Sequence, residues 1–413
     1  MKLRGLLAIT ALVMSLLVAT PSQAKNQPAD IFSSESISQI TITISGGSAG
    51  KLARAPKVSV PARFAIKNSS GTLNYKNLPV DFHLKGTSTL QQNPSLTANR
   101  PSLRVKFNRD GVMKLPFVGS MKSLTLNAMT TDQSKIHEYT AYKLYNAMGV
   151  PAPRVGYAKV TVIIGGRSYH KGLFAIIEPY DDVFLKQRFQ SQTKHLYEPC
   201  RHWTDVTKPG TSKGGETCLN TVFEVKEGWN KTPNKLDLRA LASIQKLTDK
   251  AQWWAAMDRY TDRDEFIRMW AVENFISAWD SYSGAIINNY YLRSDSLGVF
   301  TMMPTGTDET FIYNFKMDAT SIGYPLIYDN FQIQSKGRGV MFTKCLNYKP
   351  CRNQYLDALK AVKLKAKEID INGQIQQIGT MLNGTPTWSQ LAVKNWIAMK
   401  GKEVDALLRK YGR

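Results

Sequence analysis

The hydrophobic pattern of the chain changes near residue 236, and this change limits the folds that it can adopt. Before this point, apolar and polar residues mostly alternate, as in the segment 36–45. After it, apolar residues recur at helical spacing, as in 236–251, 264–278 and 393–410. Alternation is typical of half-buried strands, and a period of 3.6 is typical of amphipathic helices. The sequence therefore predicts an α+β fold with a strand-rich N-terminal half and a helix-rich C-terminal half.

The N-terminal half is predicted to combine strands with one main helix. Strand patterns occur at 36–45, 78–85, 102–107, 122–127, 157–164 and 172–177. We expect segments 78–85 and 102–107 to pair antiparallel across a long polar loop. A helix is predicted to begin with Asp132 as its N-cap and to run to Met148, where Gly149 ends it. A second helix is predicted to begin at Asp181, and a strand–turn–strand unit lies within the later helical half.

Residues 1–24 have the pattern of a secretory signal peptide that is cleaved after Ala24. Lys2 and Arg4 precede an apolar run at 6–18, and small residues follow it. A transmembrane helix needs roughly 18 apolar residues or more, so we expect no transmembrane segment after signal removal. We therefore predict a secreted or periplasmic protein in which residues 25–413 form one domain. Its N-terminal lobe would cover about 30–178 and its C-terminal lobe about 179–413.

The chain is strongly basic. It contains 54 Lys and Arg residues against 32 Asp and Glu residues, for a net charge of +22. Such a charge concentrates anions, whether nucleotide phosphates, lipid headgroups or an anionic envelope polymer. Because the basic residues are scattered without interleaved aromatic residues, and because the chain is predicted to be exported, we do not expect nucleic acid as a partner.

The cysteines indicate disulfide bonds in an oxidising compartment. The two close spacings, Cys200 with Cys218 and Cys345 with Cys351, favour local pairs over the two crossed pairings. No Cys and His cluster has the spacing of a zinc site, so we do not expect a structural metal.

The most informative stretch of the chain runs from Ala278 to Phe311 and has the residues of a phosphoryl-transfer site. Asp280 follows an apolar helix and could orient a substrate hydroxyl or accept its proton. Asn289 begins a strand and offers a neutral oxygen to a metal ion, and Asp308 offers a carboxylate that could bridge metal and phosphates. The alternative is that the aspartates cap helices or turns and that Asn289 is a turn residue.

Three further residues are candidates for nucleotide binding. Lys106 on a predicted strand could reach phosphates while paired with Glu138 of the helix, as in kinase Lys–Glu pairs. Lys85 and Arg104 are alternatives to Lys106 in this role. Glu178 ends an apolar strand at a Pro-containing bend, as in the segment of a kinase that contacts adenine. It could equally be a buried structural residue that is paired with one of the many basic residues.

The order of these motifs resembles the CotH family of spore-coat and related secreted atypical protein kinases, and the match runs nearly end to end. Each motif is weakly specific alone, but their order and spacing are fairly specific together. They are Leu84–Thr89, Pro101–Phe107, Leu124–Asn127, Asp132–Glu138, Gly172–Asp181, Trp279–Asp280, Asn289–Leu292 and Gly306–Asp308. The resemblance implies a two-lobed kinase-like fold. It also implies ATP-dependent phosphorylation of Ser or Thr in an extracytoplasmic protein, with Mg²⁺ or Mn²⁺.

One departure from the family pattern bears on activity. Many relatives have Trp-Asp-x-Asp where this chain has Thr305-Gly306-Thr307-Asp308, so only the second carboxylate remains. Losing a negative charge weakens a hard-cation site. The alternative to a kinase is therefore a catalytically inactive kinase-like protein that binds an anionic envelope polymer or serves a structural role at the surface. Mg-dependent ATP binding distinguishes the two.

Overall fold

The computed structural model describes most of the chain beyond residue 30. The described ranges are 31–32, 36–68, 73–86, 90, 95–115, 118, 121–201, 204–207, 222–228, 235–284, 286–311 and 339–413. The predicted signal peptide, residues 1–24, and Cys218 lie outside these ranges. Within them, no helix combines the length and the apolar character that crossing a bilayer requires.

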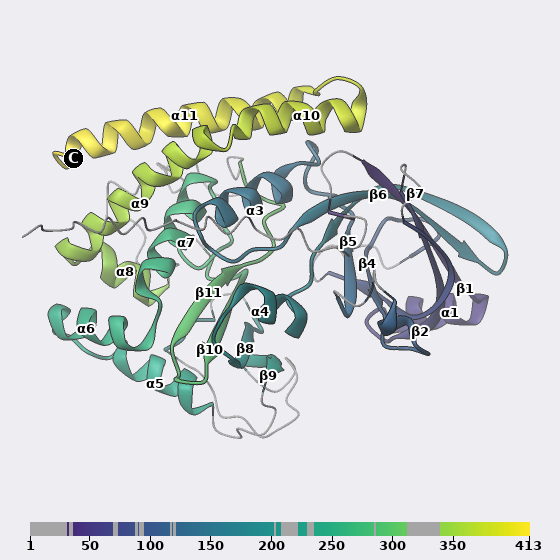
Figure 1. Cartoon of the computed structure of the whole chain (residues 1–413), viewed down its shortest axis with the longest axis horizontal. Coiled ribbons are helices and arrows are strands. Elements are labelled where there is room, and N and C mark those ends of the chain that lie inside the picture. Colours follow the sequence, from purple (N-terminus) through teal and green to yellow (C-terminus); the bar gives the residue numbers. More distant parts are fainter. Residues whose placement is uncertain are drawn as a thin grey trace, which may run out of the picture.

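Seven strands form a closed barrel at one end of the molecule (Figure 1). In chain order they are β1 (Ile37–Ile44), β2 (Val60–Lys67), β3 (Asn74–Lys85), β4 (Ser102–Lys106), β5 (Ser123–Asn127), β6 (Val155–Ile164) and β7 (Arg167–Ile177). Neighbours pair antiparallel except β1 and β6, whose parallel pairing closes the barrel. Helix α1 (Gly46–Arg54) and the 3-10 helix η1 (Val112–Lys114) lie between the strands.

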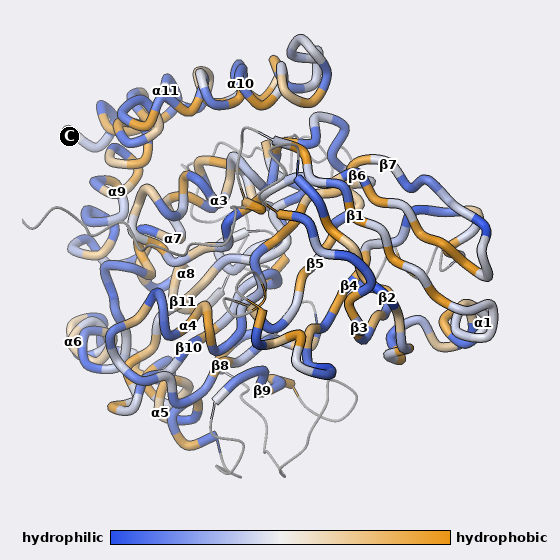
Figure 2. Tube along the Cα trace, turned by 45° about the vertical axis from the view of Figure 1, so that its right-hand side comes forward, coloured by the Kyte–Doolittle hydropathy of each residue, from blue (hydrophilic) through white to orange (hydrophobic). Residues whose placement is uncertain are grey.

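The strands of the barrel are amphipathic, as their sequence pattern predicts. In β3, Phe82 and Leu84 are fully buried, whereas His83 and Lys85 point to the opposite face. In β4, Leu103 and Val105 are likewise buried in the barrel core. Figure 2 shows these hydrophobic stretches along the strands of the barrel. The outer face of β3, β4 and β5 is therefore polar, and it is this face that is available to a site.

The rest of the chain contains a four-stranded sheet and most of the helices. The sheet has the order β11 (Phe300–Pro304), β10 (Tyr290–Asp295), β8 (Thr193–Pro199) and β9 (Phe223–Gly228). The helices are α3 (His137–Ala147), α4 (Asp182–Arg188), α5 (Leu236–Ile244), α6 (Lys250–Tyr260), α7 (Arg263–Phe275), α8 (Val340–Leu346), α9 (Lys349–Glu368), α10 (Ile371–Asn383) and α11 (Trp388–Lys410).

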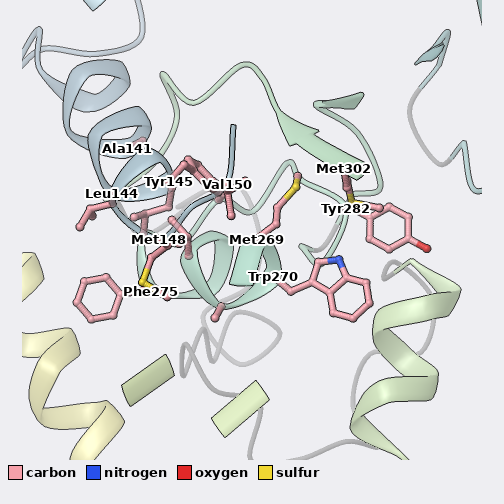
Figure 3. Close-up of a cluster of buried hydrophobic side chains, with 14 of the residues drawn as sticks. Ala141, Leu144, Tyr145, Met148, Val150, Met269, Trp270, Phe275, Tyr282 and Met302 are labelled. Carbon is pink, nitrogen blue, oxygen red and sulfur yellow. The ribbon is translucent and has the colours of Figure 1, made fainter. Parts of the chain in front are cut away.

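Helix α3 joins the barrel to the helical part of the molecule. It contacts β6 of the barrel as well as α7 and α9. Figure 3 shows the core that it shares with α7, in which Leu144, Tyr145 and Met148 face Met269 and Phe275. Burying several large side chains of this kind contributes roughly 1.5–3 kcal/mol each. The packing therefore fixes the first turn of α3 with respect to the barrel and α7.

The predicted mixed α+β architecture is confirmed, with two corrections to helix boundaries. Helix α3 begins at His137 rather than just after Asp132, because Lys135 adopts a left-handed backbone (φ 66°) that interrupts the helix. Asp132 still caps the helix from a distance, since its carboxylate accepts the His137 N–H at 2.9 Å. The single helix predicted at 236–251 is two helices, because Asp249 caps a new helix by accepting the Gln252 N–H.

The cysteine predictions are confirmed for one pair. Cys345 and Cys351 form a disulfide between α8 and the first turn of α9. Cys200 is also disulfide-bonded, and its predicted partner Cys218 lies outside the described residues. A disulfide is consistent with an oxidising compartment.

Removing the α8–α9 disulfide is expected to destabilise the protein moderately. Replacing Cys345 and Cys351 together by Ala opens a short loop and should lower the free energy of unfolding by about 2 kcal/mol. Urea unfolding of the double variant and the wild type measures the difference. Peptide mapping without reductant provides the control, and recovery of a peptide that links Cys351 to Cys200 would contradict the local pairing.

Candidate functional site

Three charged residues from three separate parts of the chain lie near enough to one another to influence each other's charge. Lys85 ends β3, Glu138 lies in the first turn of α3, and Asp308 lies in the loop after β11. Burial lowers the pKa of Lys85, as does the positive charge of Arg104, whereas the negative charges of Glu138 and Asp308 act in the opposite direction. The Lys85 side chain is accessible to solvent, so this group of residues can be reached from outside.

Glu138 has a strongly perturbed carboxyl group. Its pKa is raised to about 8, first by burial and then by the negative charge of Asp308. A hydrogen bond with Asn127 and the positive charge of Lys85 act in the opposite direction. Its Oε2 atom is buried and has no hydrogen-bond partner among the described residues. A buried carboxylate that lacks a full set of partners is suited to receive a cation.

Asp308 is held by the segment that precedes α3. The hydroxyl of Thr131 donates to Asp308 Oδ2 at 2.9 Å. Nδ1 of His137 lies 2.8 Å from the backbone oxygen of Asp308. Asp308 is therefore attached through both its side chain and its main chain, next to Glu138.

Asp280 and Asn289 meet in an adjoining pocket. The Asn289 amide donates to Asp280 Oδ2 at 3.0 Å and to the Gly306 oxygen at 3.3 Å. Asn288 donates to the same Asp280 oxygen at 3.2 Å. Asp280, Asn289, Gly306 and Thr307 all line this pocket. The predicted catalytic residue is thus connected to the loop that carries Asp308, two residues beyond Gly306.

The loop that carries Asp280 is anchored to α7 by a buried acid. Glu273 Oε2 accepts hydrogen bonds from the N–H of Ser283, at 3.0 Å, and from its hydroxyl. Burial raises the pKa of Glu273 to about 7, while the hydrogen bonds of Ser283 lower it. At Gly284, a Cβ atom would come within 2.4 Å of the Trp279 oxygen, so the loop closes tightly around Asp280.

Gly306 is adapted to the side chain that lies above it. Its backbone is left-handed (φ 59°), and a Cβ atom would lie 2.7 Å from Cγ of Asn289. A carboxylate at this position would strain the backbone and displace Asn289. The departure from the family pattern is therefore accommodated by its surroundings.

Lys106 and Lys85 lie at different places along the β3–β4 pair. Lys106 lies opposite Asp81, whereas Lys85 lies opposite Ser102, four residues earlier in β4. The charge of Lys85 is among those that act on Glu138. The geometry therefore favours Lys85, one of the two alternatives to Lys106, as the partner of Glu138.

Glu178 is buried in an ion-pair cluster at the end of β7. Its Oε1 accepts from the guanidinium of Arg154 at 2.8 Å, and its Oε2 accepts from Arg188 at 3.1 Å. This matches the alternative in which Glu178 is a paired structural residue, and it leaves the neighbouring backbone as the group that could contact a base.

The residues of this site are compatible with a metal–nucleotide complex. Within the described ranges, no group of three or more His, Cys, Asp and Glu residues is arranged to hold a metal by itself. Mg²⁺ does not require such a group, because it commonly takes one or two carboxylates together with phosphate and water oxygens. The unsatisfied Oε2 of Glu138 and the nearby carboxylate of Asp308 provide oxygen donors of this kind.

The sequence did not indicate the supporting roles of Thr131, His137 and Glu273. Thr131 precedes α3 and His137 is the first residue of α3, in a polar run that the sequence indicates only as a helix start. Glu273 lies in an otherwise apolar helix. A charged residue in such a helix is a signal that could have identified it, because a buried charge needs partners.

A comparison with protein families agrees with the resemblance seen in the motifs. A family model described as CotH kinase protein matches residues 82–400. A crystal structure of the Helicobacter pylori proinflammatory kinase CtkA is similar, with 11% sequence identity and a TM-score of 0.34. The similarity covers 75% of this chain and 90% of that one. No curated protein matches the chain at a significant level.

The raised pKa of Glu138 predicts a pH-dependent cost to stability. Between its ordinary pKa of 4.5 and its folded value of about 8, the native state binds more protons than the unfolded state, so this group lowers stability as pH rises. Glu138→Gln should therefore unfold at the same urea concentration as the wild type near pH 4.5. By pH 8.5 it should be the more stable protein, by on the order of a few kcal/mol. An unchanged difference across this range would contradict the prediction.

Proposed function

The chain belongs to the family of CotH kinase proteins, and from this premise we propose that it is a secreted atypical kinase. It would transfer the γ-phosphate of ATP to Ser or Thr of an extracytoplasmic protein. The observation that supports this most directly is the position of Asp308. Thr131 and His137 attach it to the start of α3, where Glu138 lies, and it directly follows Gly306 and Thr307, which line the pocket of Asp280. A cation, a buried acid and a half-buried acid close together are groups that can bind and orient a metal-bound triphosphate.

Each residue has a distinct task in this proposal. Lys85 would contact the phosphates as a point charge, and Glu138 would hold the Lys85 ammonium in position. Asp308 would hold Mg²⁺ or Mn²⁺, with the Asn289 oxygen as a further donor. When bound, the metal neutralises the charge that develops on the transferred phosphoryl group. Asp280 would orient the acceptor hydroxyl, because the two asparagine amides fix its carboxylate.

The proposed extracytoplasmic location of the protein is supported by observations outside the candidate site. The predicted signal peptide and the disulfide between Cys345 and Cys351 both support an extracytoplasmic protein. The family points to a protein as the phosphoryl acceptor. The alternative, an inactive protein that binds an envelope polymer, rests on the net charge of +22 and on Gly306, which stands where many relatives have a carboxylate. No contact among the described residues favours it over the kinase.

Substitutions of Asp308 and Asp280 should have different effects. Asp308→Ala removes the metal ligand and should abolish Mg-dependent binding of ATP. Asp280→Asn keeps the size and polarity of the side chain, so it should leave binding nearly intact while lowering turnover by about 10²-fold. Calorimetry with Mg–ATP and transfer of labelled phosphate to a basic protein measure the two properties. The absence of nucleotide binding by the wild type would favour the inactive alternative.

The two candidate lysines can be separated by matched substitutions. Lys85→Met should weaken binding of Mg–ATP by about tenfold or more, because it removes a phosphate contact that carries a full charge. Lys106→Met removes the same charge from the same face of the β3–β4 pair and should change binding less than twofold. If Lys106→Met proves the more harmful of the two, the assignment of Lys85 is wrong.

A further inference from the structure

We propose that Thr131 and His137 are positioning residues that hold Asp308 ready for the metal, and we name residues 129–137 the Asp308 clamp. This inference rests on the proposed function for its metal. The clamp acts on Asp308 at two points, since Thr131 Oγ1 donates to the carboxylate at 2.9 Å and His137 Nδ1 lies 2.8 Å from the main-chain oxygen. A carbonyl oxygen can only accept, so Nδ1 of His137 carries the proton.

The clamp is itself rigid. The ammonium of Lys135 donates to the backbone oxygens of Met129 and Asp132, at 2.7 and 2.6 Å. The carboxylate of Asp132 accepts the His137 N–H at 2.9 Å and the Ser134 hydroxyl at 2.5 Å. These bonds fold the segment on itself before α3 begins.

The clamp is also attached to the rest of the molecule on two sides. Tyr157 of β6 donates its hydroxyl to the Lys135 oxygen at 2.8 Å. Gln390 of α11 donates its amide to the Ser134 oxygen at 2.9 Å. The position of Asp308 therefore depends on the barrel and on the last helix, and not only on the loop that contains Asp308.

This arrangement matters because Asp308 has no neighbouring carboxylate at position 306. If a lone carboxylate must become ordered when the metal binds, the affinity of the site for the metal is lower, since each immobilised side chain costs free energy. Thr131 orders the Asp308 carboxylate in advance by donating to Oδ2, so that Oδ1 would be the oxygen offered to the metal. His137 keeps the loop at the start of α3, next to Glu138. The clamp thus offsets part of the metal affinity that is lost because residue 306 is a glycine and not an aspartate.

The experiment compares three variants at two adjacent threonines. Thr131→Val keeps the shape of the side chain but removes the hydroxyl, Thr131→Ser keeps the hydroxyl, and Thr130→Val makes the same change at the exposed neighbouring position. Binding of Mn²⁺ in the presence of ATP is followed by electron paramagnetic resonance, without any turnover. We expect the Kd for Mn²⁺ to rise about tenfold in Thr131→Val and to stay within twofold of the wild type in the other two.

A second measurement uses the protein without ligands. The chain has five His residues, so the ring nitrogens of His137 can be assigned by ¹⁵N NMR, and we expect Nδ1 to be protonated. The ¹³C resonance of the Asp308 carboxylate should move in Thr131→Val and return in Thr131→Ser.

The two experiments test the clamp and the proposed function separately. Equal Mn²⁺ affinity in Thr131→Val and Thr130→Val, or a neutral His137 protonated at Nε2 only, would overturn the clamp. Failure of the wild type to bind Mn²⁺ with ATP would instead overturn the kinase proposal, and the NMR signals of His137 and Asp308 would still decide whether the clamp holds the loop.

Discussion

The burial of helix α3 is the constraint on which the rest of the site depends. Eight of its eleven residues are buried, including His137 and Glu138 in its first turn. The helix is packed against the barrel, α7 and α9, so its charged first turn has little access to water. The carboxyl group of Glu138 therefore interacts with Asn127, Lys85 and Asp308 instead of solvent, and its protonation responds to them. The apolar packing of α3 thus determines the electrostatic environment of Glu138.

The strands and the general architecture could be predicted from sequence because they follow from local periodicity. The alternation in β3 and β4 correctly separates the buried Phe82 and Leu84 from the outward-facing Lys85. The start of α3 could not be predicted in the same way. Its turn depends on a left-handed Lys135 whose ammonium is satisfied by backbone oxygens, and no propensity scale contains such a contact. The closure of the barrel by β1 and β6 likewise depends on pairing across a long stretch of chain.

The site was predictable as a set of residue types, but not as a set of contacts. Asp280, Asn289 and Asp308 were chosen for their chemistry and order, and Asp280 and Asn289 are in hydrogen-bond contact. Lys85 and Lys106 could not be distinguished, because both lie on the same face of one strand pair and only their positions along it separate them. The hydrogen bond between Thr131 and Asp308 joins residues that are 177 positions apart, so no local sequence pattern predicts it.

The parallel pairing of β1 with β6 has a consequence for how the chain acquires its structure. Ile37 pairs with Tyr157, and between them lie all of β2 to β5 and α3. During synthesis, β1 can pair with β2 early, but its other edge stays open until residues near 164 have emerged. Such non-local closure is slow, and an open strand edge can pair with other chains. The N-terminal strand is therefore the part of this barrel that is exposed longest to aggregation, and its protection depends on the arrival of a strand made much later.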